Sequence, residues 1–167
     1  MGGAFASDDF TQVFEEMFLP AFRVAYRILA NVTDAEDAAA EAMARALRSW
    51  ERVRGLPYRD AWIIRVTANV AIDRARRPRH TSTVPDEGDG DHTDGVVLRV
   101  GVARALASLS KRQREVLSLR YLADVSEADV ASLLGISVNS VKTHTLRGVA
   151  AMRQSLGPDW EGELALD

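Results

Sequence analysis

Apolar residues recur every three or four positions through most of the chain, which is the spacing of one face of an α-helix. Residues 1–80 show no alternation of apolar and polar side chains of the kind that a half-buried strand has. The pattern predicts helices over residues 8–29, 33–49, 60–77, 96–109, 110–123, 126–134 and 138–156. Pro20 interrupts the first stretch and predicts a break, a kink or the start of a new helix there. We therefore expect an all-α fold.

Capping residues mark the starts of several of these helices, because Ser and Thr hydroxyls accept hydrogen bonds from free backbone N–H groups. The predicted caps are Thr33 with Glu36, Ser110 with Gln113, Ser126 with Asp129, and Ser137. Gly135 is placed to end the helix that Ser126 begins, in a left-handed conformation. The last two helices are thus separated by a short turn, as in a helix-turn-helix motif whose second helix enters the major groove.

The second helix of this motif has two distinct faces. Its predicted inward stripe consists of Val138, Val141, Thr145, Val149, Met152 and Leu156. The opposite face carries Ser140, Thr143 and Arg147, with Lys142 and His144 on its flanks. Residues 137–157 contain no Asp or Glu, although the whole protein has a net charge of −3. Hydroxyl and cationic groups without acids favour contact with phosphates and base edges, whereas the simpler alternative is a solvated helix surface.

Composition narrows the function further. The chain has 167 residues and no cysteine, which excludes disulfides, thiolate zinc sites and a cysteine nucleophile. Its three histidines are scattered, and no nucleophile–base pair or phosphate-binding glycine loop is present, so we expect no metal, no cofactor and no enzyme activity. Without an export signal or a long apolar run, we expect a cytoplasmic protein with no membrane insertion.

Charge and composition divide the chain into parts. Residues 81–95 are polar, rich in glycine and acidic, with five acids and no base, which predicts a flexible acidic linker. We therefore expect two small helical domains at residues 1–80 and 96–157, followed by a disordered tail at 158–167.

The first domain contains a basic helix preceded by an unusual loop. Residues 65–79 hold five arginines and one aspartate, which is more positive charge than a helix dipole requires. The loop at residues 50–60 combines Gly55 and Pro57 with the apolar side chains of Leu56 and Tyr58. Such a loop beside arginines favours a binding role.

These motifs together resemble the extracytoplasmic-function group of bacterial RNA polymerase sigma factors, in the sigma-70 family. The segments AYRILANVTDAEDAAAEAMARALRSW and AWIIRVTANVAIDRARR resemble the family's first domain. The segment LSKRQREVLSLRYLADVSEADVASLLGISVNSVKTHTLRGVAAMR resembles its second domain. The order of these motifs across an acidic linker is the specific feature, and it covers nearly the whole chain.

The resemblance implies a role for each part. The residues that would dock on the clamp helices of the largest polymerase subunit are Asp34, Asp37, Glu41, Arg45 and Leu47. The non-template strand of the downstream promoter element would meet Arg54, Gly55, Leu56, Tyr58, Arg65, Asn69, Arg76 and Arg77. The upstream element would be read in duplex form by Ser140, Lys142, Thr143, His144 and Arg147. The resemblance further implies contact with the flap of the second-largest subunit and admits an anti-sigma protein as a partner.

Two points qualify this hypothesis. Ala40 stands where the family usually has glutamine, so we expect a weaker or differently arranged polymerase contact. The segment REVLSLRYLADVSEADVASLLGISVNSVKTH also resembles the output domain of response-regulator and quorum-sensing proteins, which bind operators as dimers. That alternative predicts a receiver or ligand pocket in residues 1–80, for which the strand pattern is missing. For a sigma factor, we expect the isolated protein to bind DNA weakly until polymerase spaces its domains.

Overall fold

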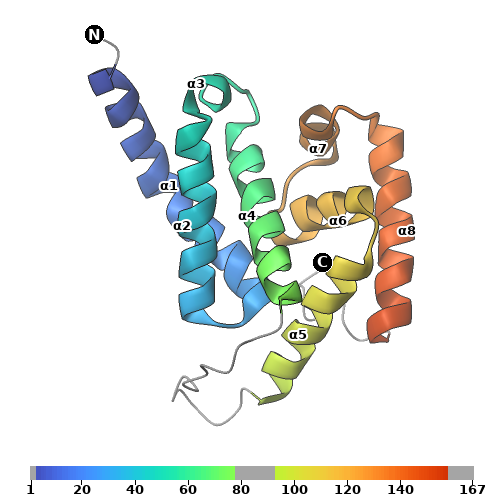
Figure 1. The fold of residues 1–167 in the computed structure, drawn as a ribbon. Helices are drawn as coiled ribbons and strands as arrows, with labels where there is room; N and C mark the ends of the chain where they lie inside the picture. Colours follow the sequence, from blue (N-terminus) through green and yellow to red (C-terminus); the bar gives the residue numbers. More distant parts are fainter. Residues whose placement is uncertain (1–2, 78–92, 158–167) are drawn as a thin grey trace.

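The computed structural model describes residues 3–77 and 93–157, with side chains over 9–77 and 101–157, and these residues form helices and no strand (Figure 1). The N-terminal domain comprises α1 (Gly3–Leu29), α2 (Val32–Arg48), α3 (Trp50–Val53) and α4 (Arg59–Arg76). The C-terminal domain comprises α5 (Thr93–Ser108), α6 (Lys111–Leu117), the π-helix η1 (Ser118–Leu122), α7 (Glu127–Leu134) and α8 (Val138–Leu156). The predicted all-α class is confirmed.

Helices α1, α2 and α4 pack side by side in the N-terminal domain (Figure 1). The side of α2 that faces its neighbours is made largely of alanines with no exposed surface, namely Ala35, Ala38, Ala39, Ala42 and Ala46. Alanine favours the helix and keeps the helix surface small, so that α1 and α4 can approach closely. Larger side chains such as Ile28, Met43 and Ile63 fill the remaining core. The outer side of α2 is left open.

Three helices of the C-terminal domain begin at the caps that the sequence predicts, whereas α5 begins earlier than predicted and the predicted helix 110–123 is divided into α6 and η1. Ser110 and Gln113 form a reciprocal capping box at the start of α6. The hydroxyls of Ser126 and Ser137 accept hydrogen bonds from backbone N–H groups in the first turns of α7 and α8. Gly135 adopts the left-handed conformation, with φ 63°, between α7 and α8. The predicted helix-turn-helix is therefore confirmed, and α8 stands at the edge of the molecule (Figure 1).

The two domains contact one another directly. Helix α5 packs against α1 and α4, while η1 and α7 also contact α4. One apolar cluster runs across both domains and joins Ile64 and Ile72 of α4 to Val102, Leu106 and other residues of the C-terminal domain. Most of the predicted linker and the whole predicted tail lie outside the described residues. At the end of the predicted linker, residues 93–95 are already part of α5.

Three local features differ from the predictions. Of the alternatives predicted at Pro20, the break and the start of a new helix are absent, because α1 continues through it with Met17, Ala21 and Val24 packed into the core on both sides. Helix α2 is capped by Asn31, not Thr33: the Asn31 side chain accepts a 2.8 Å hydrogen bond from the backbone N–H of Asp34. At the start of α8, Val138 is 40% exposed and does not join the inward stripe.

Candidate nucleic-acid interfaces and docking face

The outer face of α8 has the properties expected of a DNA-reading surface. Val141, Gly148 and Met152 bury the inner side of the helix, which turns the opposite side to solvent. Lys142, Thr143 and Arg147 are exposed, and Ser140 and His144 are partly buried on its flanks. The Thr143 hydroxyl donates to the backbone oxygen of Asn139 at 2.9 Å, so that its oxygen remains an acceptor. The structure thus brings the five predicted upstream-element residues onto one helix without an acid.

Leu146 belongs to this face, although it was not among the residues predicted from the sequence. It is 73% exposed, more than any other large apolar side chain in the described part of the chain. At 100° per residue, Leu146 lies between Lys142 and Ala150, almost opposite the buried Val141. The signal was available in the sequence, because the same helical projection that placed Thr143 outward also places Leu146 outward.

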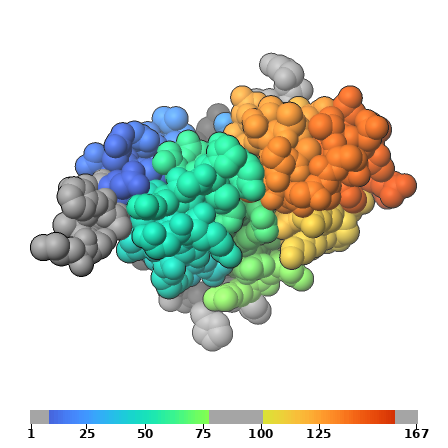
Figure 2. Space-filling model, turned by 90° about the horizontal axis from the view of Figure 1, so that it is seen from above, coloured from blue at the N-terminus to red at the C-terminus, as the bar shows by residue number. Residues whose placement is uncertain are grey.

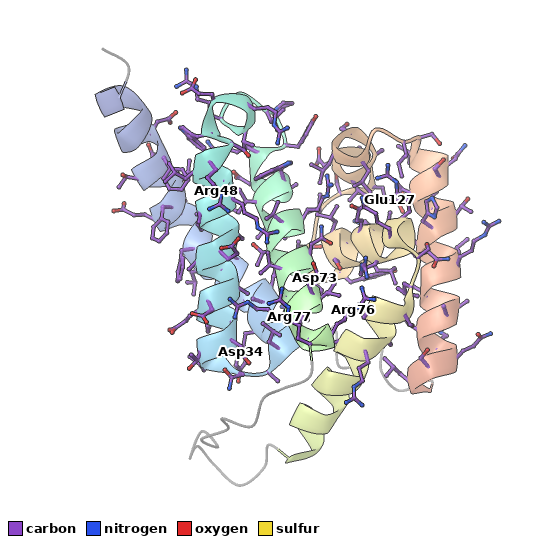
Figure 3. The ribbon with its side chains drawn as sticks, in the orientation of Figure 1. Asp34, Arg48, Asp73, Arg76, Arg77 and Glu127 are labelled. Carbon is purple, nitrogen blue, oxygen red and sulfur yellow. The ribbon has the colours of Figure 1, made fainter. Side chains whose placement is uncertain are left out.

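The predicted downstream-element residues follow the loop before α4 and one side of that helix. Arg54 and Gly55 are exposed in the loop, and Leu56 and Tyr58 are partly buried. On α4, Arg65, Asn69 and Arg76 share a face at helical spacing, and Arg77 follows at the C-terminal end. Figure 3 shows Arg76 and Arg77 at the end of α4 that is nearest to α5.

Part of this surface already has partners within the protein. The Arg65 Nε atom lies 3.4 Å from Glu115 Oε1 in α6, and Tyr58 packs against the core of the C-terminal domain. Between the loop and the start of α7 lies a cleft of about 600 Å³. The structure therefore brings the loop and Arg65 beside the C-terminal domain, whereas Arg77 lies more than two helical turns from Arg65 along α4.

The open side of α2 has two rows of side chains. The first is charged: Glu41 Oε1 lies 2.8 Å from Arg45 Nε and 3.4 Å from Arg48, and Asp37 pairs with Arg74 of α4 at 3.3 Å. The hydrogen bond from Arg45, with the charges of Arg45 and Arg48, lowers the pKa of Glu41 below its ordinary value.

The second row of α2 is apolar and consists of Ala40, Ala44 and Leu47 at helical spacing. Leu47 is 53% exposed. Its helical spacing with Ala40 and Ala44 places Leu47 beside the charged row rather than within it. Asp34 is at the first turn of the helix (Figure 3). Ala44 and Arg48 are members of this face that were not predicted from the sequence. An apolar row bordered by charges is typical of a surface that binds another protein.

Other kinds of site find no support in the described residues. Over 9–77 and 101–157, no group of three or more His, Asp or Glu side chains is arranged to hold a metal ion. None of the described helices combines the length and apolar character needed to cross a lipid bilayer.

Comparison with known proteins identifies the family. The models for sigma-70 region 2 and sigma-70 region 4 match residues 14–81 and 99–152. The extracytoplasmic-function (ECF) RNA polymerase sigma factor SigL of Mycobacterium tuberculosis is 30% identical over 157 residues, covering 86% of this chain and 86% of SigL. This chain is an ECF sigma factor.

Other relatives agree with this assignment. The RNA polymerase sigma-E factor of Streptomyces coelicolor is 28% identical over 160 residues, which cover 93% of this sigma factor and 89% of the relative. SigW of Bacillus subtilis, another ECF sigma factor, is 28% identical and covers 81% of this chain and 82% of SigW. Such proteins bind core RNA polymerase and promoter DNA. The sigma factor directs the polymerase to specific promoters and assists DNA opening, and the alternative of an operator-binding regulator is not favoured.

Proposed function

We propose that this sigma factor divides promoter recognition between its domains, residues 1–80 and 96–157. The outer face of α8 reads the upstream element as a duplex. The loop before α4 and the face carrying Arg65 and Asn69 hold the non-template strand of the downstream element. The observation that carries the first assignment is the acid-free outer side of α8, which the Gly135 turn sets at the edge of the molecule.

Opening DNA at the downstream element requires a site for an unstacked base. Unstacking one base costs a few kcal/mol, which stacking on an apolar or aromatic wall offsets. Leu56 and Tyr58 can supply that wall, with Arg54 beside them for a phosphate. The basic end of α4 at Arg76 and Arg77 then supports the strand further along.

Polymerase docking is assigned to α2. Its charged row contains Asp34, Asp37, Glu41 and Arg45, and its apolar row ends at Leu47. We assign the partner surface to the clamp helices of the largest subunit, and the contact of the C-terminal domain to the flap of the second-largest subunit. Ala40 lies in the apolar row, so burial of small side chains replaces the amide contact of a glutamine. The polymerase partner implies a cytoplasmic location, and an anti-sigma protein that covers these faces is a further expected partner.

The role of Arg147 predicts a measurable loss of promoter recognition. Replacing Arg147 by alanine is expected to cost about 1–3 kcal/mol of upstream recognition by the holoenzyme if its guanidinium reads a base. Arg147→Lys is the matched control, because lysine keeps the charge but not the two-pronged geometry. Competition binding among promoter variants measures the effect. If both variants discriminate among the promoters as the wild type does, and alanine alone lowers the salt dependence of binding, Arg147 contacts a phosphate and not a base.

Asn69 is expected to act at a different step. Asn69→Ala should leave binding of the closed promoter duplex nearly unchanged and reduce opening, because the side chain contacts only the separated strand. Permanganate footprinting of unpaired thymines detects opening, and a gel-shift assay at low temperature measures duplex binding. If Asn69→Ala and Arg147→Ala give the same pattern in both assays, the proposed division between domains is wrong.

Leu146 is expected to contact a thymine methyl group, the apolar feature that the major groove presents. Replacing a contacted thymine by deoxyuridine removes that methyl and should weaken upstream binding about fivefold, or roughly 1 kcal/mol. Leu146→Ala should lose affinity by a similar factor and become insensitive to the base change. A full deoxyuridine effect in the alanine variant would show that Leu146 does not touch the methyl.

A further inference from the structure

The exposed side of α8 is centred on residues that the sequence did not single out. Over residues 138–150, the exposed side chains run from Val138 at one edge to Arg147 at the other. At 100° per residue, Asn139 and Leu146 lie near the middle of this arc, within about 20° of each other. Figure 2 looks down from the side on which α8 begins, where the orange surface of α7 and α8 forms one end of the protein. Asn139 therefore lies on the side of α8 that faces away from the rest of the protein.

The hydroxyl groups around the first turn of α8 already have partners within the helix. The Ser137 hydroxyl oxygen accepts a 3.1 Å hydrogen bond from the backbone N–H of Ser140 and lies 2.9 Å from the Ser140 hydroxyl. The Thr143 hydroxyl donates a 2.9 Å hydrogen bond to the backbone oxygen of Asn139. These three side chains thus hold the start of the helix, and none of them bonds to the amide group of the Asn139 side chain.

The Asn139 side chain has no structural role of this kind. It is exposed, and no residue in the described part of the chain forms a hydrogen bond with its amide group. Ser137 occupies the capping position of α8, so Asn139 does not act as the cap. Asparagine is also a weaker helix former than alanine, because its side chain competes for backbone hydrogen bonds. A residue that weakens a helix without a compensating contact in the protein is typical of a functional position.

The chemistry of a side-chain amide selects one base in the major groove. Its NH₂ group donates and its oxygen accepts, and adenine presents the matching pair, an N7 acceptor beside an N6 amino donor. Guanine presents two acceptors there, and thymine and cytosine each present a single hydrogen-bonding group. The N-terminal residues of the second helix of a helix-turn-helix reach the base edges. Asn139 is in the first turn of α8, so its short side chain is placed for this contact.

We propose that Asn139 determines specificity for one adenine of the upstream element, by donating to N7 and accepting from the N6 amino group. This inference rests on the proposed function, in which the outer face of α8 reads the upstream duplex. Leu146 follows on the same line of the helix seven residues later, about 10 Å along the axis, so it meets a different base pair. Lys142 and Arg147 lie on either side of this line and supply positive charge. The contacts of Asn139 and Leu146 are therefore separable.

Adenine analogues test this contact in the holoenzyme. The probe is the upstream duplex of a promoter mapped by run-off transcription, with its adenines replaced one at a time by 7-deazaadenine, which lacks N7, or by 2-aminopurine, which lacks the N6 amino group. Both analogues still pair with thymine. At one adenine, each replacement should lower the affinity of the wild type about tenfold in competition binding. Asn139→Ala should lose affinity by a similar factor and become insensitive to both analogues at that position.

Gln154→Ala is the matched control, because it removes an exposed amide near the other end of α8. It should keep the wild-type affinity, both analogue effects and the melting temperature, which Asn139→Ala should also keep.

Two outcomes would overturn the proposal. One is a full effect of both analogues in Asn139→Ala, or no adenine in the wild type at which both analogues act. The other is an equal loss by Asn139→Ala on all upstream sequences with a smaller salt dependence, which marks a phosphate contact. In either case, effects of Arg147→Ala and of deoxyuridine that persist would leave the proposed function intact. If those effects are absent too, α8 does not read the upstream element.

Discussion

Replacing Leu47 by aspartate is expected to weaken the complex with core RNA polymerase by roughly 2 kcal/mol, or about 30-fold in dissociation constant. Leu47 is 53% exposed at the end of the apolar row of α2, and docking on polymerase would bury it. Aspartate removes that apolar burial and adds a charge that must lose its hydration. Fluorescence anisotropy of the labelled sigma factor, titrated with core polymerase, measures the change.

Leu19→Asp is the matched control for this experiment. Leu19 of α1 is 51% exposed, so the same substitution alters charge and exposed apolar area equally, but at a position outside the proposed docking face. It should bind polymerase like the wild type, and neither variant should lower the melting temperature by more than a few degrees. Equal losses from both substitutions would mean that α2 has no special part in docking.

Gly148→Val is expected to destabilise the C-terminal domain by about 3 kcal/mol, since an overpacked core cannot relax freely. A Cβ atom at position 148 would lie 2.9 Å from the Cδ1 of Leu117, and Leu117 is itself buried. Helix α8 would have to move away from α6, which also displaces the proposed DNA-reading face. Chemical denaturation followed by circular dichroism measures the loss of stability.

Gly101→Ala provides the comparison for Gly148→Val. A Cβ at position 101 would meet only the terminal Cδ2 of Leu156, at 3.2 Å. Replacing a helical glycine by alanine contributes up to about 1 kcal/mol of helix propensity, so that this variant should be close to neutral or slightly stabilised. A Gly148 variant as stable as the wild type would show that α6 and α8 are not packed closely there.

Local signals in the sequence predicted much of the C-terminal domain. Hydroxyl caps at Ser110, Ser126 and Ser137, and a glycine at position 135, act through bonds within a few residues of one another, so they can be recognised without knowledge of the fold. The outward direction of Lys142 on the final helix follows equally from helical spacing.

Predictions failed where distant packing decides the outcome. Pro20 costs α1 a hydrogen bond, yet burial of the flanking apolar residues against α2 and α4 keeps the helix continuous. Asn and Thr are both good N-cap residues, so the sequence alone does not decide between Asn31 and Thr33 as the cap of α2. The cap depends on where the chain leaves α1. Nothing near Glu115 in the sequence indicates that its partner is Arg65, because the two lie in different domains.

Run-off transcription with purified core RNA polymerase, on genomic fragments whose start sites are then mapped, tests the central claim most directly. We expect the wild-type protein to direct initiation from a set of promoters that share an upstream and a downstream element. Arg147→Ala should alter selection at the upstream element, and Asn69→Ala should reduce opening at the same promoters. Initiation no more selective than that of core polymerase alone would contradict the claim that this protein selects promoters.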